Sequence, residues 1–391
     1  MTRVVITGLG IVSAAGRGVA ATEAALRANQ DGLGRLTRFA TRRAGELPVA
    51  EVREPVPAGR PRLRALAAMA LEDAVRDAGL SGADLSRAGL ALGTTVGGMP
   101  ESEDAFAALL AGQPVDPIVW RRHECGVTTA ALMEGLALRG PPLTVANACA
   151  SGAQSLALAG DALRLGLTDV MLAGGADALC KLTLEGFHSL LALDPQGCRP
   201  FDRARAGTSL GEGAAFLVLE TEERARARGA RALAELAGWC CTCDAHHPTA
   251  PHPEGLGAEA ALRGALAMAG LAPAEVGYVN AHGTGTTDND LVEGRTLRRV
   301  FAGAVPPLSS TKRIFGHALG AAGAIEAVVS VLALARGLLP GTAGLQDPDP
   351  ACEVEPLRAP AQGAPLAALS ASFGFGGNDT VLALRRAEVA P

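Results

Sequence analysis

Short apolar runs alternate with longer helix-like runs along the whole chain, and this alternation restricts the fold more than any other feature of the sequence. The strand-like runs of the first part lie at 3–7, 89–94, 143–147, 170–174 and 214–219. The clearest helix-like runs are amphipathic or rich in alanine, and they lie at 61–78, 152–165 and 254–269. This order predicts an α/β protein with central, largely parallel sheets.

A charged stretch at 222–231 leads into a second series of the same kind. Here we expect strands at 232–239, 276–281, 366–372 and 380–385, and helices at 289–300 and 317–336. The chain is therefore predicted to consist of two successive α/β halves, 1–235 and 236–391. No low-complexity linker separates them, so we expect the halves to pack as one body.

Composition narrows the class of protein. A hydrophobic content of 48% with 19% charged residues indicates a folded chain, and the net charge of -5 argues against a nucleic-acid binder. No apolar stretch approaches the roughly 20 residues that span a bilayer, and the N-terminus lacks a signal-peptide pattern. We therefore expect no membrane association, and a cytoplasmic location in which the eight cysteines stay reduced.

Cys149 follows an apolar strand-like run and directly precedes a helix of small residues. A thiol at a helix N-terminus faces the positive end of the helix dipole, which favours the nucleophilic thiolate. The same turn offers free backbone N–H groups to a developing oxyanion. The alternative is a buried structural cysteine, the commonest fate of a free cysteine and the one we expect for the other seven.

Two loops rich in glycine follow later in the chain. At the end of a predicted strand, His282 enters a Gly/Thr loop in which small residues allow a ligand backbone to approach and the Thr hydroxyls can hydrogen-bond an extended polar substrate. Taken alone, such a histidine is more often structural. Glycines also surround Phe375, which indicates either a mobile loop that gates a pocket or an ordinary hairpin turn.

Lys312 is one of only two lysines among the 35 basic residues, and it lies five residues before His317. Arginine is a wide planar fork, whereas lysine is a compact point charge whose proton affinity shifts readily on burial. The chain uses arginine for nearly every other positive charge, yet here it carries a lysine close in sequence to a histidine. We therefore interpret Lys312 as a site residue rather than a surface charge.

Six motifs, taken in order, resemble those of the β-ketoacyl-acyl carrier protein synthases of the elongating type, which serve fatty acid and type II polyketide synthesis. They are residues 8–13, the turn at Cys149, residues 198–202 followed by 211–214, the His-Gly-Thr-Gly-Thr loop, the Ser-Thr-Lys and Gly-His run, and Phe-Gly-Phe-Gly-Gly. This resemblance implies a thiolase fold, in which a duplicated α-β-α-β-α arrangement forms a five-layer sandwich, usually paired into a dimer.

The resemblance also implies roles for single residues. Cys149 would be the nucleophile that takes the acyl chain from its carrier, and His282 and His317 would complete a Cys-His-His constellation. Lys312 and Glu293 would support the histidines as an ion pair. The cation of Lys312 would lower the proton affinity of His317 and so keep that imidazole neutral.

Further contacts follow from the same resemblance. Phe375 would be the gate, and its backbone N–H would join that of Cys149 in the oxyanion hole. Thr284 and Thr286 would contact the phosphopantetheine arm of the carrier, with Thr249 as a further contact. The implied reaction is the decarboxylative Claisen condensation of malonyl carrier protein with the acyl chain on Cys149, an acyltransferase activity that needs no separate cofactor and no metal.

The expected partners are an acyl carrier protein and either a second copy of the chain or a ketosynthase-like chain-length partner. Fatty acid, polyketide and polyene products stay open, as does a thiolase-like acyltransferase. Four positions depart from the family's common pattern: Asn147, Thr208, Thr287 and Asp379, the last where asparagine is frequent.

Two other interpretations fit the residues less well. A dinucleotide fingerprint at 8–13 fails because Ser13 occupies the third glycine position. The cysteines and histidines at 240–252 lack two paired sets of zinc ligands.

Overall fold

The structure is a computed structural model that describes residues 2–41, 46–57 and 59–387. A continuous mixed sheet passes through it in the order β4-β3-β5-β6-β1-β7-β13-β12-β8-β9, with β2 beside β1. The first-half strands are β1 (Val4–Ser13), β2 (Gly16–Arg17), β3 (Gly89–Gly93), β4 (Pro142–Val145), β5 (Val170–Asp177) and β6 (Gly213–Thr221). The second-half strands are β7 (Ala234–Cys243), β8 (Val276–Asn280), β9 (Leu308–Ser309), β12 (Ala367–Gly374) and β13 (Asn378–Arg386), and a small separate sheet pairs β10 (Leu338–Leu339) with β11 (Ala361–Gln362).

The two halves repeat one topology. Taken in chain order, strands β1, β3, β4, β5 and β6 of the first half correspond to β7, β8, β9, β12 and β13 of the second. With this correspondence, the spatial order β4-β3-β5-β6-β1 of the first half matches the order β9-β8-β12-β13-β7 of the second. In the first half, β6 is antiparallel to the other main strands, which are parallel to one another. In the second half, β13 takes the same place. The expectation of largely parallel sheets therefore holds within each half. A short antiparallel pairing of β1 with β7 joins them, while the boundary at 235/236 stays a prediction.

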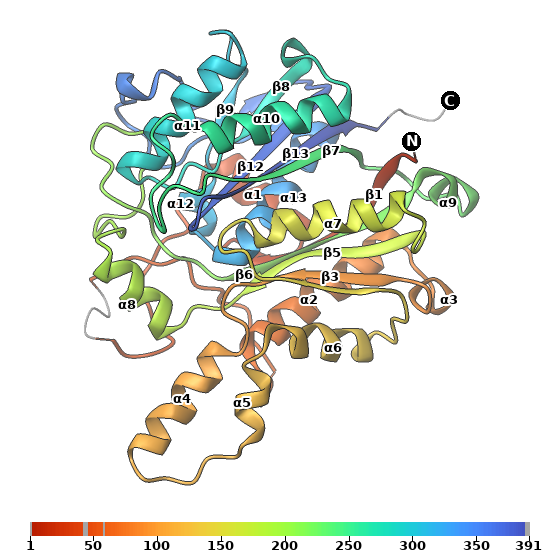
Figure 1. Cartoon of the computed structure of the whole chain (residues 1–391), viewed down its shortest axis with the longest axis vertical. Coiled ribbons are helices and arrows are strands. Elements are labelled where there is room, and N and C mark those ends of the chain that lie inside the picture. Colours follow the sequence, from red (N-terminus) through yellow and green to blue (C-terminus); the bar gives the residue numbers. More distant parts are fainter. Residues whose placement is uncertain (1, 42–45, 58, 388–391) are drawn as a thin grey trace.

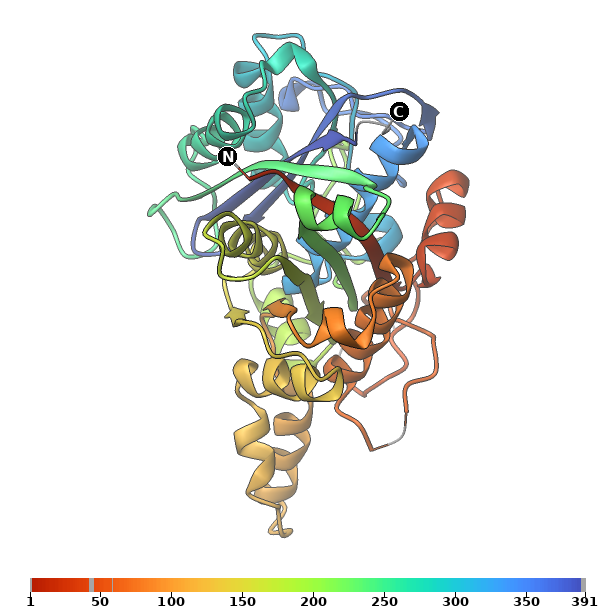
Figure 2. The ribbon, with the colours of Figure 1, turned by 90° about the vertical axis from the view of Figure 1, so that its right-hand side faces the viewer.

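Helices cover and separate the two half-sheets, as Figure 1 shows. The outer faces carry α2 (Arg62–Ala78) and α10 (Leu256–Ala269), and α7 (Ser151–Arg164) packs with α13 (Ala322–Arg336) between the sheets. This is the predicted five-layer α-β-α-β-α sandwich. The other helices are α1 (Val19–Ala28), α3 (Gly82–Leu85), α4 (Met99–Leu110), α5 (Ile118–Arg122), α6 (Cys125–Gly135), α8 (Lys181–Ser189), α9 (Glu222–Ala227), α11 (Thr287–Val300) and α12 (Lys312–Phe315). Helices α4 and α5 project from the body as an arm (Figure 2).

Small residues let the two central helices approach closely. A Cβ added at Gly152 of α7 would lie 2.6 Å from the carbonyl oxygen of Gly320, and one added at Gly323 of α13 would lie 2.8 Å from the Cβ of Ala153. Real side chains do not tolerate such contacts, so this interface requires glycine on both helices. It brings the start of α7, which follows Cys149, against the start of α13.

One apolar stretch of the described residues, Leu319–Arg336, is long and apolar enough to cross a membrane by composition, but 89% of it is buried inside the fold. The expectation that no apolar run approaches such a length was therefore wrong. The run is apolar on all sides because α13 lies between two sheets and has no solvent face.

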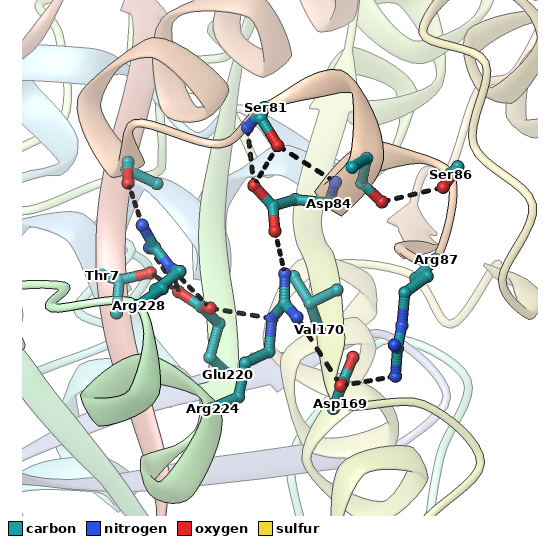
Figure 3. A network of polar contacts seen from close by, with 12 residues as sticks. Thr7, Ser81, Asp84, Ser86, Arg87, Asp169, Val170, Glu220, Arg224 and Arg228 are labelled. Carbon is teal, nitrogen blue, oxygen red and sulfur yellow. Dashed lines mark hydrogen bonds and ion pairs between the residues drawn. The ribbon is translucent and has the colours of Figure 1, made fainter.

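Two arginines at and just after helix α9, Arg224 and Arg228, are committed to ion pairs. Arg224 and Arg228 both contact the fully buried carboxylate of Glu220, which also accepts the hydroxyl of Thr7 (Figure 3). Arg224 also pairs with Asp84, which closes the capping box at the start of α3. These arginines hold α9 against the sheet and are not free charges for a partner.

Candidate active site

Cys149 lies in the turn between β4 and α7, as its sequence pattern predicts. Ala148 before it is held at φ 47°, a left-handed conformation that alanine rarely adopts. Two bonds to Ser151 brace the turn: its Oγ accepts the N–H of Asn147 at 2.8 Å and its hydroxyl donates to the carbonyl of Ala148 at 2.7 Å. The turn thus delivers Cys149, which is 5% exposed, to the cavity described below.

His317 reaches the thiol because its segment is not helical. The predicted helix at 317–336 begins only at Ala322, after Gly316 at φ 68° and a short 3-10 turn. The backbone of His317 instead pairs with the neighbouring segment, donating its N–H to Ser209 at 2.7 Å and accepting that of Gly211 at 3.0 Å. Its Nε2 lies 2.9 Å from the Sγ of Cys149.

His282 follows β8 and enters the same site from the second half. The carboxylate of Glu293 on α11 accepts the backbone N–H groups of His282 and Gly283, each at 2.8 Å. The rings of His282 and His317 lie 5.4 Å apart and nearly perpendicular. The three side chains that the sequence singled out therefore come together from three separate segments.

The predicted ion pair of Lys312 with Glu293 was wrong in its partner. The ammonium of Lys312 pairs with Glu326 of α13 and donates to the carbonyl oxygen of His282 at 2.8 Å. Glu293 is occupied by backbone N–H groups, and the turn of α13 that follows His317 supplies the facing carboxylate instead. A lone glutamate in an otherwise apolar helix was the sequence signal for Glu326, which the sequence reasoning missed.

Burial and the Lys312 cation together hold both imidazoles neutral. The pKa values of His282 and His317 lie well below the ordinary range, first because both rings are buried and second because Lys312 is near. Burial also raises the pKa of Glu326 to about 7, against the opposing effect of Lys312. Lys312 is 1% exposed, so solvent screens its charge little and that charge acts on the buried imidazoles.

The Cys149 thiol is not a resting thiolate. Burial raises the pKa of Cys149 to about 11, although the backbone N–H of Phe375 and the charge of Lys312 both oppose this shift. The expectation of a thiolate favoured by the helix start fails because removal from water outweighs the dipole. The neighbouring Nε2 of His317 is placed to accept the proton.

The hairpin between β12 and β13 carries Phe375 into the site. Its backbone N–H is directed at the sulfur of Cys149. A Cβ added at Gly374 would lie 3.2 Å from the backbone nitrogen of Cys149, so glycine keeps the space in front of that N–H clear. The hairpin and the Cys149 turn therefore meet beside the thiol, with the Phe375 N–H directed at the sulfur. The Phe375 ring stacks on Phe187 of α8, with centroids 5.1 Å apart, a contact that no sequence motif indicated.

A cavity of about 260 Å³ connects these groups to solvent. Its walls include the three predicted threonines: Thr284 and Thr286, whose hydroxyls lie 2.8 Å apart, and Thr249. The 244–253 loop, which contains Thr249, is joined to the hairpin because Gly376 donates its N–H to the carbonyl of Pro248 at 2.7 Å. Among the described residues, no group of three or more His, Cys, Asp or Glu side chains is arranged to hold a metal.

Comparison with known proteins gives the family. The beta-ketoacyl synthase N-terminal domain matches residues 1–225, and the beta-ketoacyl synthase C-terminal domain matches residues 233–346.

Individual relatives cover most of the chain. Nodulation protein E of Rhizobium meliloti is 40% identical over 83% of this chain and 82% of its own. The 3-oxoacyl-(acyl-carrier-protein) synthase 2 of Synechocystis sp. is 37% identical over 98% of each chain. The solved ishigamide ketosynthase/chain length factor is 37% identical, with a TM-score of 0.94 over 99% of this chain and 100% of that one. The chain belongs to the beta-ketoacyl synthase family, whose members are acyltransferases.

Proposed function

We propose that this protein condenses an acyl chain held on Cys149 with malonyl carrier protein, with loss of carbon dioxide, in fatty acid or type II polyketide synthesis. The observation that carries this proposal is the 2.9 Å contact between Cys149 and His317 in a buried cavity that His282 also lines. The family membership supports the reaction type, whereas the roles of individual residues rest on the geometry.

In the first step, the thiol of Cys149 attacks the thioester of the incoming acyl carrier. Its proton passes to Nε2 of His317, because the buried thiol is protonated at rest and the imidazole is neutral. The developing oxyanion takes hydrogen bonds from the backbone N–H groups of Cys149 and Phe375. The carrier thiol then leaves with a proton, and the acyl chain stays on Cys149.

In the second step, malonyl carrier loses carbon dioxide and leaves an enolate. Neutral His282 and His317 can donate hydrogen bonds to the enolate oxygen without transferring a proton to its carbon. The enolate carbon attacks the acyl thioester, a carbon–carbon bond forms, and Cys149 is released. Lys312 acts as a positioning residue here, because it bonds the carbonyl of His282 and disfavours an imidazolium.

The substrates would arrive on the phosphopantetheine arm of an acyl carrier protein, with Thr249, Thr284 and Thr286 along its path. The names of two relatives support the partners: one is a synthase acting on an acyl carrier protein and one is a ketosynthase with a chain length factor. We propose a homodimer or a heterodimer with such a partner, in the cytoplasm. A catalytically silent chain-length subunit is disfavoured, because Cys149 and both histidines are present.

Two assays test the proposal. Purified protein given malonyl carrier and acyl carriers of varied length should release a condensed β-ketoacyl product, and the preferred length identifies the pathway. Cys149→Gln should abolish condensation but keep decarboxylation of malonyl carrier, since the histidines serve that step. Loss of decarboxylation in a folded Cys149→Gln variant would contradict this division of labour.

A further inference from the structure

Two carboxyl groups face one another beside the gate hairpin, and the mechanism above uses neither. Asp379 is the second residue of β13, and Asp244 follows β7; both line the cavity. Asp379 is the more deeply buried of the two. It is 4% exposed, and its Oδ2 is fully buried with no hydrogen-bond partner in the described part of the chain.

The two carboxylates share one small space. A Cβ added at Gly257 of α10 would lie 2.5 Å from Oδ1 of Asp244 and 2.6 Å from Oδ2 of Asp379, so both oxygens border the gap that glycine leaves. Asp244 is held there, because its two oxygens accept the backbone N–H groups of Gly257 at 3.0 Å and His252 at 2.8 Å. Asp379 has no such bonds.

The groups around Asp379 make a negative charge there unfavourable. Burial raises the pKa of Asp379 to about 8, and the acidic groups of Asp244 and of Glu293 on α11 raise it further. Its ladder partners on β12 and β7, Phe373 and Thr242, do not titrate in this range. The titratable groups that face Asp379 are thus both acidic, and burial raises the pKa of Glu293 itself to about 8.

This pair lies where two segments of the site meet. The N–H of Asp244 donates to the carbonyl of Gly377 at 2.8 Å, and the N–H of Gly376 donates to that of Pro248. These bonds tie the 244–253 loop to the hairpin that carries Phe375. A side chain contact between Asp244 and Asp379 would reinforce the tie at the base of the hairpin.

We propose that Asp379 is a positioning residue whose carboxyl keeps its proton and through it donates a hydrogen bond to Asp244, which reinforces the backbone bonds that join the 244–253 loop to the gate hairpin. When the proton leaves, two like charges share a buried gap and repel. The loop with Thr249 then separates from the hairpin, and the Phe375 N–H loses its fixed position near Cys149. Condensation activity therefore falls at alkaline pH, because this carboxyl loses its proton.

The kinetic test rests on the proposed function and compares condensation kcat/KM at two pH values in wild type, Asp379→Asn and Asp379→Ser. Between about pH 7 and about pH 9, the kcat/KM of wild type should fall about tenfold. The protonated fraction of a carboxyl with a pKa of about 8 falls by that factor over this range. Each variant, normalised to its own value at the lower pH, should lose clearly less than wild type, since neither new residue ionises there and the ionisation of Glu293 and Glu326 is common to all three proteins. Asp161→Asn is the matched control: this carboxyl also has a raised pKa from burial but bonds Trp239 outside the cavity, and it should follow wild type.

Two further measurements need no activity. The infrared spectrum of wild type near neutral pH should contain a protonated-carboxyl C=O band that Asp379→Asn removes. Hydrogen exchange at the Asp244 and Gly376 amides, corrected for its intrinsic pH dependence, should rise in wild type at alkaline pH and stay low in the variant. Absence of the band, or the same alkaline response in Asp379→Asn, would overturn the proposal. If condensation fails at every pH while the band and the exchange response are present, the proposed function fails and this inference stands.

Discussion

Removing the charge of Lys312 should destabilise the protein through the carboxylate it leaves behind. In Lys312→Met, Glu326 stays buried at 2% exposure, and its Oε2 already has no hydrogen-bond partner. Breaking a buried pair from one side costs about 3–5 kcal/mol where the remaining group stays ionised, because its charge then has no compensation. Since the pKa of Glu326 is about 7 even with Lys312 present and rises without it, the full loss is expected at alkaline pH and a smaller one where Glu326 takes up a proton. Methionine keeps a flexible side chain of similar length, so packing contributes little to this loss.

The double variant Lys312→Met/Glu326→Gln separates charge from packing. With both charges gone, most of the lost stability should return, because replacing a buried pair by neutral groups is often nearly free. Urea denaturation of wild type, the two single variants and the double variant forms a complete cycle and yields the coupling free energy. A double variant as unstable as Lys312→Met would refute the pairing with Glu326.

The same double variant tests the effect of Lys312 on the histidines. Without the cation, the pKa values of His282 and His317 should rise but stay below the ordinary range, since burial is the larger cause of their shift. A donor that must be neutral is lost as pH falls through its pKa, so a higher pKa moves this loss to higher pH. The acid limb of malonyl decarboxylation should therefore shift upward, and an unchanged limb would contradict the role assigned to Lys312.

Four other substitutions have distinct expected outcomes. His317→Ala should slow both acylation and decarboxylation, whereas His282→Ala should spare acylation, because only His317 contacts the thiol of Cys149; single-turnover assays with acyl and malonyl carriers separate the two. Gly374→Ala should slow acylation by roughly 10²-fold, the cost of one displaced oxyanion donor, and a near-normal rate would argue against that oxyanion hole. Glu220→Gln should lower the free energy of unfolding by about 3–5 kcal/mol in urea denaturation while kcat of the folded enzyme is kept, and a stable variant would show that its two arginine pairs contribute little.

Sequence patterns predicted most of the site because each motif lies at the end of a strand or the start of a helix. Cys149, His282 and His317 are motif residues, and the structure brings them together. The partner of Lys312 was missed because pairing across the fold leaves no local pattern: Glu326 follows it by more than three helical turns of chain, on another element. Phe187 was missed for the same reason, since α8 carries no motif.

Burial was the other quantity that the sequence could not supply. The turn at Cys149 indicated a thiolate, but burial of the side chain leaves a neutral thiol. The pattern at 317–336 indicated one helix, but Gly316 at a positive φ and a 3-10 turn precede Ala322 and leave His317 on backbone that pairs with residues 209–211. In both cases local propensity was correct for the isolated segment and tertiary packing decided the outcome.

The central claim is that Cys149 carries the acyl chain between the two steps. Protein incubated with acyl carrier alone should gain the mass of one acyl group, and peptide mass spectrometry should locate it on Cys149. Adding malonyl carrier should discharge that group into a β-ketoacyl product in a single turnover. An acyl group on another cysteine, or one on Cys149 that malonyl carrier does not discharge, would contradict the account.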